Sequence, residues 1–367
     1  MNSIKKVIRF WARHWLLVIL VAILAYALWQ RVNYRELLST FAGVSWIFVG
    51  LAILANLASI LLKVASWKII FDFSFRSVRG CWRDLTSSLM IGFLVNALVP
   101  ARMGELARAY VISRRQTLNG HQVSRSTVFG TIVLERVFDG FALAMIIIYG
   151  ITRMDLPGWA DRGAIVLLAV AIFFAGALVL LEAKRESIVQ SAAAAEANYR
   201  EHHPWRKKQM ARLKGVLARF SEGQQVLRSP GRVIAILCTT TASWMSQLTA
   251  VYLSLNAFHL GFTGFLGALL LLILINVAGA LPATPGNIGI FQLATVIPLT
   301  ITYGSAPAGQ QCLPDIKCIS ESTALAFSIG LQAIEGSIGL GVGSAFLLRE
   351  GLNLKQVKRE SIRKIEE

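Results

Sequence analysis

Three charged residues with regular spacing follow a proline in the segment LVPARMGELARAYVI, which begins at Leu98. They are Arg102, Glu105 and Arg108, each three residues from the next. Residues three apart on a helix are neighbours, so Glu105 can form an ion pair with either arginine. The other arginine then keeps a positive charge that suits an anion such as a phosphate. The alternative is that both arginines only extend toward the membrane interface.

The turn before these residues favours the anion. Pro100 ends one apolar segment, and Gly104 helps to start the next helix. The first amide groups of a helix have no partner within it and lie at the positive end of its dipole, where anions bind. We therefore expect Arg102, Gly104, Glu105 and Arg108 to contact an anionic substrate group.

A second group of charges lies in LERVFDGFALA, inside an apolar segment. Glu135 and Asp139 share one helix face, and Arg136 can reach Asp139. Ionisable groups within a membrane are costly unless they are paired or face water. The sequence allows three roles for them: holding Arg102, relaying protons, or neutralising one another.

Glu335 is a separate candidate in the last apolar segment. Gln332 and the pair Glu335-Gly336 there occupy a place loosely comparable to that of Asp139-Gly140 in the third predicted span. Glu335 has no cation near it in the sequence. We expect it to be a group that changes protonation during transport.

The proline turn occurs twice. Pro100 and Gly104 correspond to Pro282 and Gly286, at a constant offset of 182 residues. The second turn carries no charge, and backbone broken by proline and glycine at membrane depth needs protein or a wet cavity beside it. The alternative is a purely structural kink. The candidate substrate-binding residues of this region are Asn276, Pro285, Gly286, Asn287, Gly289 and Gln292.

The composition predicts an all-α polytopic membrane protein. Hydrophobic residues make up 55% of the chain and the mean hydropathy is +0.59, well above a soluble domain. The net charge of +17 lies beside apolar segments, which fits an anionic membrane surface and not nucleic acid. The sequence lacks a phosphate-binding loop, a nucleophile elbow and metal-spaced Cys or His residues, so we expect no enzyme activity, no cofactor and no metal.

The segments that must position these residues are six full spans and two turn segments. The apolar runs predict spans at about 15–30, 46–66, 126–150, 163–181, 232–257 and 322–348. The turn segments, 86–115 and 264–303, each carry one proline turn and return to their own face. Lys and Arg then gather on one side, which predicts that both termini are cytoplasmic.

This order of spans predicts two inverted-topology repeats, each with a re-entrant segment broken by proline and glycine. The repeats are residues 1–157 and 158–349, followed by a basic tail at 350–367. Whether 264–303 is re-entrant or a full hairpin stays open, because its first arm is nearly long enough to span.

Two loops carry further features. The cytoplasmic loop 182–231 contains an amphipathic basic helix after Pro204, suited to anionic headgroups. Cys312 and Cys318 lie on the opposite side, where they form either a disulfide or two thiols.

Three motifs in order, LVPARMGELARAYVISRR, LERVFDG and LPATPGNIGIFQLA, resemble the transmembrane flippase domain of lysylphosphatidylglycerol synthases and its stand-alone relatives. The resemblance implies movement of polar or isoprenoid-type lipids across the membrane. It assigns the family's turn residues to Arg102 and Glu105, and its other motif residues to Glu135, Arg136, Asp139, Pro285, Gly286 and Gly289. The synthases also carry a soluble aminoacyl-transfer domain after the membrane part. Because only a basic tail follows the last span here, we expect translocation without synthesis.

The resulting hypothesis is a flippase-like translocase in the bacterial inner membrane for a polar, anionic or isoprenoid-linked lipid, whose partners are membrane lipids. It competes with a membrane scaffold that recruits glycosyltransferases or lipid-modifying enzymes, and with a secondary transporter of a soluble anion. A homo-oligomer is compatible with the sequence, which specifies no stoichiometry.

Overall fold

The structure is a computed structural model of the chain. It describes residues 33–75, 78, 80–99, 103–118, 123–153, 223–279, 284–303 and 319–354, with isolated positions at 169–190 and 356–360. These residues form helices and connecting turns, and no strand occurs among them. The all-α architecture is thus confirmed for the described part of the chain.

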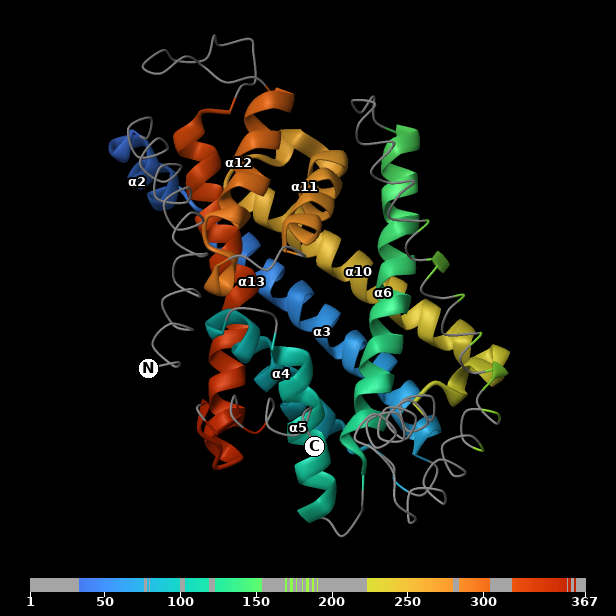
Figure 1. Ribbon diagram of the computed structural model, residues 1–367. Helices are drawn as coiled ribbons and strands as arrows, with labels where there is room; N and C mark the ends of the chain where they lie inside the picture. Colours follow the sequence, from blue (N-terminus) through green and yellow to red (C-terminus); the bar gives the residue numbers. More distant parts are fainter. Residues whose placement is uncertain are drawn as a thin grey trace, which may run out of the picture. The chain divides into compact units, whose positions relative to one another are not determined.

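Four long helices of 28 or 29 residues dominate the structure (Figure 1): α3 (Trp46–Ser74), α6 (Arg125–Arg153), α10 (Pro230–Ala257) and α13 (Glu321–Arg349). At 1.5 Å per residue each is about 43 Å long, more than the roughly 30 Å of a hydrocarbon core. They overlap four of the six predicted spans, and α3 continues eight residues beyond its predicted end at 66. The spans predicted at 15–30 and 163–181 lie outside the described residues, apart from isolated positions.

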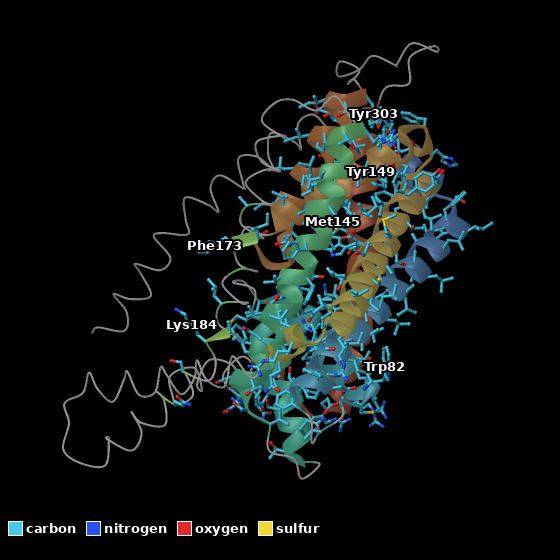
Figure 2. All side chains as sticks on the ribbon, turned by 90° about the vertical axis from the view of Figure 1, so that its right-hand side faces the viewer. Trp82, Met145, Tyr149, Phe173, Lys184 and Tyr303 are labelled. Atoms are coloured by element: carbon cyan, nitrogen blue, oxygen red, sulfur yellow. The ribbon has the colours of Figure 1, made fainter. Side chains whose placement is uncertain are left out.

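Apolar composition identifies membrane-crossing helices. Among the described residues α3, α10, α13 and Gly261–Gly279 are long and apolar enough to span. Side chains on such helices are exposed although they are apolar: Trp46 at the start of α3 is 76% exposed. The helix α6, which covers the predicted span 126–150, is not in this group, although its Met145 and Tyr149, labelled in Figure 2, are exposed and apolar. Exposed apolar side chains on spanning helices are suited to lipid, and the chain is a multi-pass membrane protein.

Four shorter helices lie between the long ones: α4 (Trp82–Leu98), α5 (Gly104–Leu118), α11 (Gly264–Gly279) and α12 (Ile290–Tyr303). The order long, short, short, long therefore occurs twice along the chain. The second turn segment has the predicted bounds, whereas the first begins four residues before its predicted start and ends three residues after its predicted end. Asp84 lies in the first turn of α4, where a negative charge stabilises a helix start. With 17 residues, α4 is about 26 Å long, less than a full span.

The chain divides into two compact units, each discontinuous in sequence. The first comprises Met1–Ile53, Ala97–Ala101 and Leu248–Gly336, and the second comprises Leu54–Asn96, Arg102–Gln247 and Ser337–Glu367.

Polar contacts and an apolar core hold the second unit together. Ser59 and Ser243 join α3 to α10 through their hydroxyl groups at 3.1 Å, and Ser66 and Thr240 do so at 3.0 Å. Because the residue number rises along α3 as it falls along α10, the two helices are antiparallel. Apolar side chains pack beside them, drawn from α3, α6, α10 and the short helix η2 (Gln225–Arg228): Ile70, Leu134, Phe138, Val226 and Ile236.

In the first unit, α11 packs against α12. The hydroxyl group of Tyr303 at the end of α12, labelled in Figure 2, donates a hydrogen bond of 3.0 Å to the Thr263 carbonyl in η3 (Gly261–Thr263), which precedes α11. The ring of Phe258, after α10, makes edge contacts with Phe41 of α2 (Tyr34–Ala42) and Phe327 of α13. These contacts join α2, α11, α12 and α13 within the first unit.

Candidate functional site

Close packing of α4 and α5 sets the geometry of the first turn segment. A Cβ atom on Gly104 would lie 2.2 Å from the carbonyl oxygen of Gly92, and one on Gly92 would lie 2.6 Å from Cγ of Arg108. Only glycine allows this approach. The Gly104 N–H donates a hydrogen bond of 2.7 Å to Oδ1 of Asn96. The backbone N–H of Gly104, which the sequence suggested could bind an anion, therefore already donates its hydrogen bond to the Asn96 side chain of α4.

Arg108 is an internal cation. Its side chain is 1% exposed, and its Nη2 lies 2.6 Å from Oε2 of Glu135, which is equally buried. The guanidinium lies 4.2 Å above the ring of Trp67, a favourable cation–π position. Arg108 does not extend to the surface, so the interface alternative is wrong for this residue.

Lys63 is a charged residue of this region that the sequence reasoning missed. Its Nζ donates a hydrogen bond of 2.6 Å to Oδ2 of Asp139 and lies 3.8 Å from Oε1 of Glu135. Arg136 Nη1 contacts the same Asp139 oxygen at 3.2 Å, in the predicted pair with spacing of three. The signal for Lys63 was present: it is a single charge deep in the apolar run that starts at Trp46, and such charges mark functional sites.

Five ion pairs link six side chains in a series that we call the charge ring. Arg136 Nη2 lies 3.4 Å from Oε1 of Glu105, and Glu105 lies one helical turn before Arg108 on α5. The sequence offered Arg102 or Arg108 as partners of Glu105. The structure pairs it with Arg136 because α5 packs along α6. In order, with alternating sign, the charge ring is Arg108, Glu135, Lys63, Asp139, Arg136 and Glu105.

The charges of the ring sum to zero. Three cations and three carboxylates alternate, so each buried charge has a partner, as burial requires. Arg108 carries no surplus charge, contrary to the sequence expectation. Arg102 lies outside the described residues. Mutual neutralisation, one of the three roles that the sequence allowed for Glu135, Arg136 and Asp139, is what these contacts achieve.

Exposure differs strongly around the ring. Arg108 and Glu135 are 1% exposed, whereas the Arg136 side chain is 40% exposed. Arg136 lies 11 residues after the start of α6 and 17 before its end, which is about 16 and 25 Å along the axis. In a spanning helix, as predicted for 126–150, an exposed charge this far from both ends requires water or a polar ligand beside it. Arg136 is thus the accessible cation of the ring.

The second turn uses left-handed backbone. Gly286, within the 3₁₀ turn η4 (Pro285–Asn287), has φ 65°, and Asn287 has φ 58°. Glycine and asparagine are the residues that adopt this conformation at least cost. The Thr284 hydroxyl donates a hydrogen bond of 2.5 Å to the Ile288 carbonyl across the turn.

Glutamine side chains form hydrogen bonds with the backbone groups of the second turn. The Gly289 N–H donates to Oε1 of Gln292 at 2.7 Å, and Nε2 of Gln292 donates to Oε1 of Gln332 at 2.6 Å. Nε2 of Gln332 then donates to the Gly286 carbonyl at 2.8 Å. Asn276 donates to Leu272 within its own helix. The uncharged turn is therefore held from α12 and α13, with α13 contributing a residue, Gln332, outside the predicted site.

The end of α4 approaches this turn within the first unit. The carbonyl oxygen of Ala97 lies 3.4 Å from where a Cβ atom on Gly286 would stand. Glu335, half-buried, lies three residues after Gln332 and so on the same side of α13. That Glu335 changes its protonation state during transport stays a prediction.

Among the described residues, no group of three or more His, Cys, Asp or Glu side chains could hold a metal ion.

Comparison with known proteins gives one match. The sequence model of the family described as the lysylphosphatidylglycerol synthase TM region matches residues 15–313, more than half of the chain. The matched part contains all six residues of the charge ring and the second turn, while Gln332 and Glu335 follow it. No curated protein and no solved structure matches the chain.

Proposed function

The chain belongs to the family of the lysylphosphatidylglycerol synthase TM region, and on this premise we propose that it moves an anionic lipid across the bacterial inner membrane. The headgroup would meet Arg136 and Arg102 while the acyl tails stay in the bilayer. The lipid is polar and phosphate-bearing, with isoprenoid-linked lipids included in the class. The proposed activity is translocation, with no chemical change to the lipid.

The exposed guanidinium of Arg136 carries this proposal. It lies deep within a 29-residue helix and is held by two single contacts, at 3.2 Å to Asp139 and 3.4 Å to Glu105. A guanidinium has five N–H donors and binds phosphate oxygens in a bidentate manner. The six charges of the ring sum to zero. Arg102, three residues before Glu105 in the sequence, therefore contributes one uncompensated positive charge. An anionic headgroup would compensate that charge.

The arrangement of α3 and α10 supports an inverted repeat. The two helices begin the two long–short–short–long series, and they are antiparallel. Ser59 contacts Ser243, 184 residues later, close to the 182-residue offset of the proline turns. A helix that crosses its own antiparallel counterpart is what a two-fold axis in the membrane plane produces, and transporters with such repeats bind substrate near the midplane.

Orientation and energy coupling complete the proposal. Both termini would be cytoplasmic, following the distribution of Lys and Arg. The sequence has no ATP-binding motif, so movement would be downhill or coupled to protons or the membrane potential. Glu335 is the proposed protonation site.

The test is lipid movement in proteoliposomes with fluorescent phosphatidylglycerol and, in parallel, fluorescent phosphatidylcholine. Arg136→Gln removes the exposed charge, and Arg153→Gln on the same helix, also exposed, is the matched control. A charge-assisted hydrogen bond contributes about 1.5–3 kcal/mol, so the rate for phosphatidylglycerol should fall by about 10- to 100-fold in Arg136→Gln only.

Two results would contradict the proposal. If the folded wild type moves neither lipid faster than empty liposomes do, the scaffold hypothesis takes its place, and deletion of loop 182–231 should then abolish partner recruitment. If radiolabelled inorganic phosphate enters the liposomes while lipid does not move, the protein transports a soluble anion.

A further inference from the structure

We infer that Lys63 is a positioning residue that keeps Asp139 neutralised while Arg136 leaves it to bind a phosphate-bearing anion. The inference rests on the proposed function and deepens it. In this inference Arg136 is the cation that changes partner. Lys63 is the cation that stays paired with Asp139 and so lowers the free-energy cost of that change.

Asp139 has two cations on one oxygen. Its Oδ2 lies 2.6 Å from Lys63 and 3.2 Å from Arg136. The shorter contact is a charge-assisted hydrogen bond slightly below the usual range of lengths, and the longer one is at the upper limit for such bonds. Asp139 can therefore lose Arg136 and remain paired.

Lys63 is placed to serve both buried carboxylates. It is 15% exposed, and besides Asp139 it lies 3.8 Å from Oε1 of Glu135, an atom with no hydrogen-bond partner in the described structure. Glu135 keeps Arg108 on its other oxygen. With Lys63 present, both carboxylates of α6 retain a cation after Arg136 has left.

The ion pair of Arg136 with Glu105 costs the least free energy to break. Glu105 is 21% exposed, so its carboxylate can be solvated when Arg136 leaves, and a partly exposed pair contributes little. Without Lys63, by contrast, Arg136 would be the one cation among the described residues that contacts the buried Asp139, and it would stay there, since breaking a buried pair is costly. Lys63 thus sets how readily Arg136 becomes available.

The experiment measures affinity for fluorescent phosphatidylglycerol in detergent micelles, for full-length protein with Lys63→Met, Asp139→Asn or both. We expect Lys63→Met to bind at least about tenfold more weakly, because Arg136 is retained by Asp139. Asp139→Asn should bind about fivefold more tightly, because it removes a competitor of the anion for Arg136. The double variant should recover to within about threefold of wild type, since no retaining carboxylate is left.

Three outcomes would overturn the role of Lys63. A double variant as weak as Lys63→Met would mean that Lys63 itself contacts the anion. Weaker binding by Asp139→Asn would mean that Asp139 is needed for binding and does not compete with it. Equal affinity in all variants would mean that Lys63 only supports the fold. Because Asp139→Asn is predicted to gain affinity, a poorly folded Lys63→Met does not remove the test.

Further arms separate this inference from the proposed function. If wild type binds phosphatidylglycerol no better than phosphatidylcholine, and Arg136→Gln changes nothing, the proposed function itself fails. Competition with inorganic phosphate identifies the source of the anion: displacement at millimolar concentration indicates a soluble phosphate, and no displacement indicates a lipid headgroup. The order of affinities among the Lys63 and Asp139 variants supports the role of Lys63 with either source.

Discussion

Removal of either member of the Arg108–Glu135 pair should destabilise the protein, but to different extents. Both side chains are 1% exposed and 2.6 Å apart, and breaking such a pair costs about 3–5 kcal/mol. Glu135→Gln leaves Arg108 with the Trp67 ring, a contact that contributes only about 1–2 kcal/mol. A guanidinium cannot lose its proton, so the full cost of about 3–5 kcal/mol should appear.

Arg108→Met should cost less, about 2 kcal/mol. The Glu135 carboxylate keeps Lys63 at 3.8 Å, an attraction of about 4 kcal/mol at an effective dielectric constant of about 20. A buried carboxylate can also bind a proton and become neutral. The double variant Arg108→Met, Glu135→Gln leaves no buried charge at this position. It should be less destabilised than the sum of the single variants by about 2–3 kcal/mol.

The free energy of unfolding can be measured by SDS titration of the protein in mixed micelles, followed by tryptophan fluorescence. Arg153→Met, which removes an exposed arginine of α6, is the control and should change stability by less than about 0.5 kcal/mol. If Glu135→Gln is no worse than Arg108→Met, or if the two effects simply add, the reasoning about the buried ring is refuted.

Two further predictions concern the turns. Gly104→Ala should lower stability by about 2–4 kcal/mol, because the added Cβ meets backbone at 2.2 Å and disturbs the bond to Asn96; Gly50→Ala, with open space around it, should be neutral or stabilising in the same titration. Gln332→Leu removes the partner of the Gly286 carbonyl and of the Gln292 amide, so hydrogen–deuterium exchange across this turn should rise, and unchanged exchange would show that the amide chain does not hold it.

The helices and their order followed from the sequence. The predicted spans at 46–66, 126–150, 232–257 and 322–348 lie within the longer helices α3, α6, α10 and α13, because the thickness of the bilayer sets the minimum length of a spanning helix. The second turn segment has its predicted bounds, 264–303, because glycine and proline interrupt a helix through local backbone geometry. Interruption of a helix by glycine or proline depends only on residues that are close in the sequence, so the sequence is enough to predict it.

The partners within the charge ring came from the tertiary structure. Spacing allowed Glu105 to pair with Arg102 or Arg108, yet it pairs with Arg136 of another helix, and Lys63 joins from α3. The sequence by itself determined the spans, the turns and the presence of intramembrane charge. Tertiary structure decided which charges meet and which one stays exposed. The physical reason is that ion pairing depends on distances between helices, and these are set by packing, such as the glycine contact between α4 and α5.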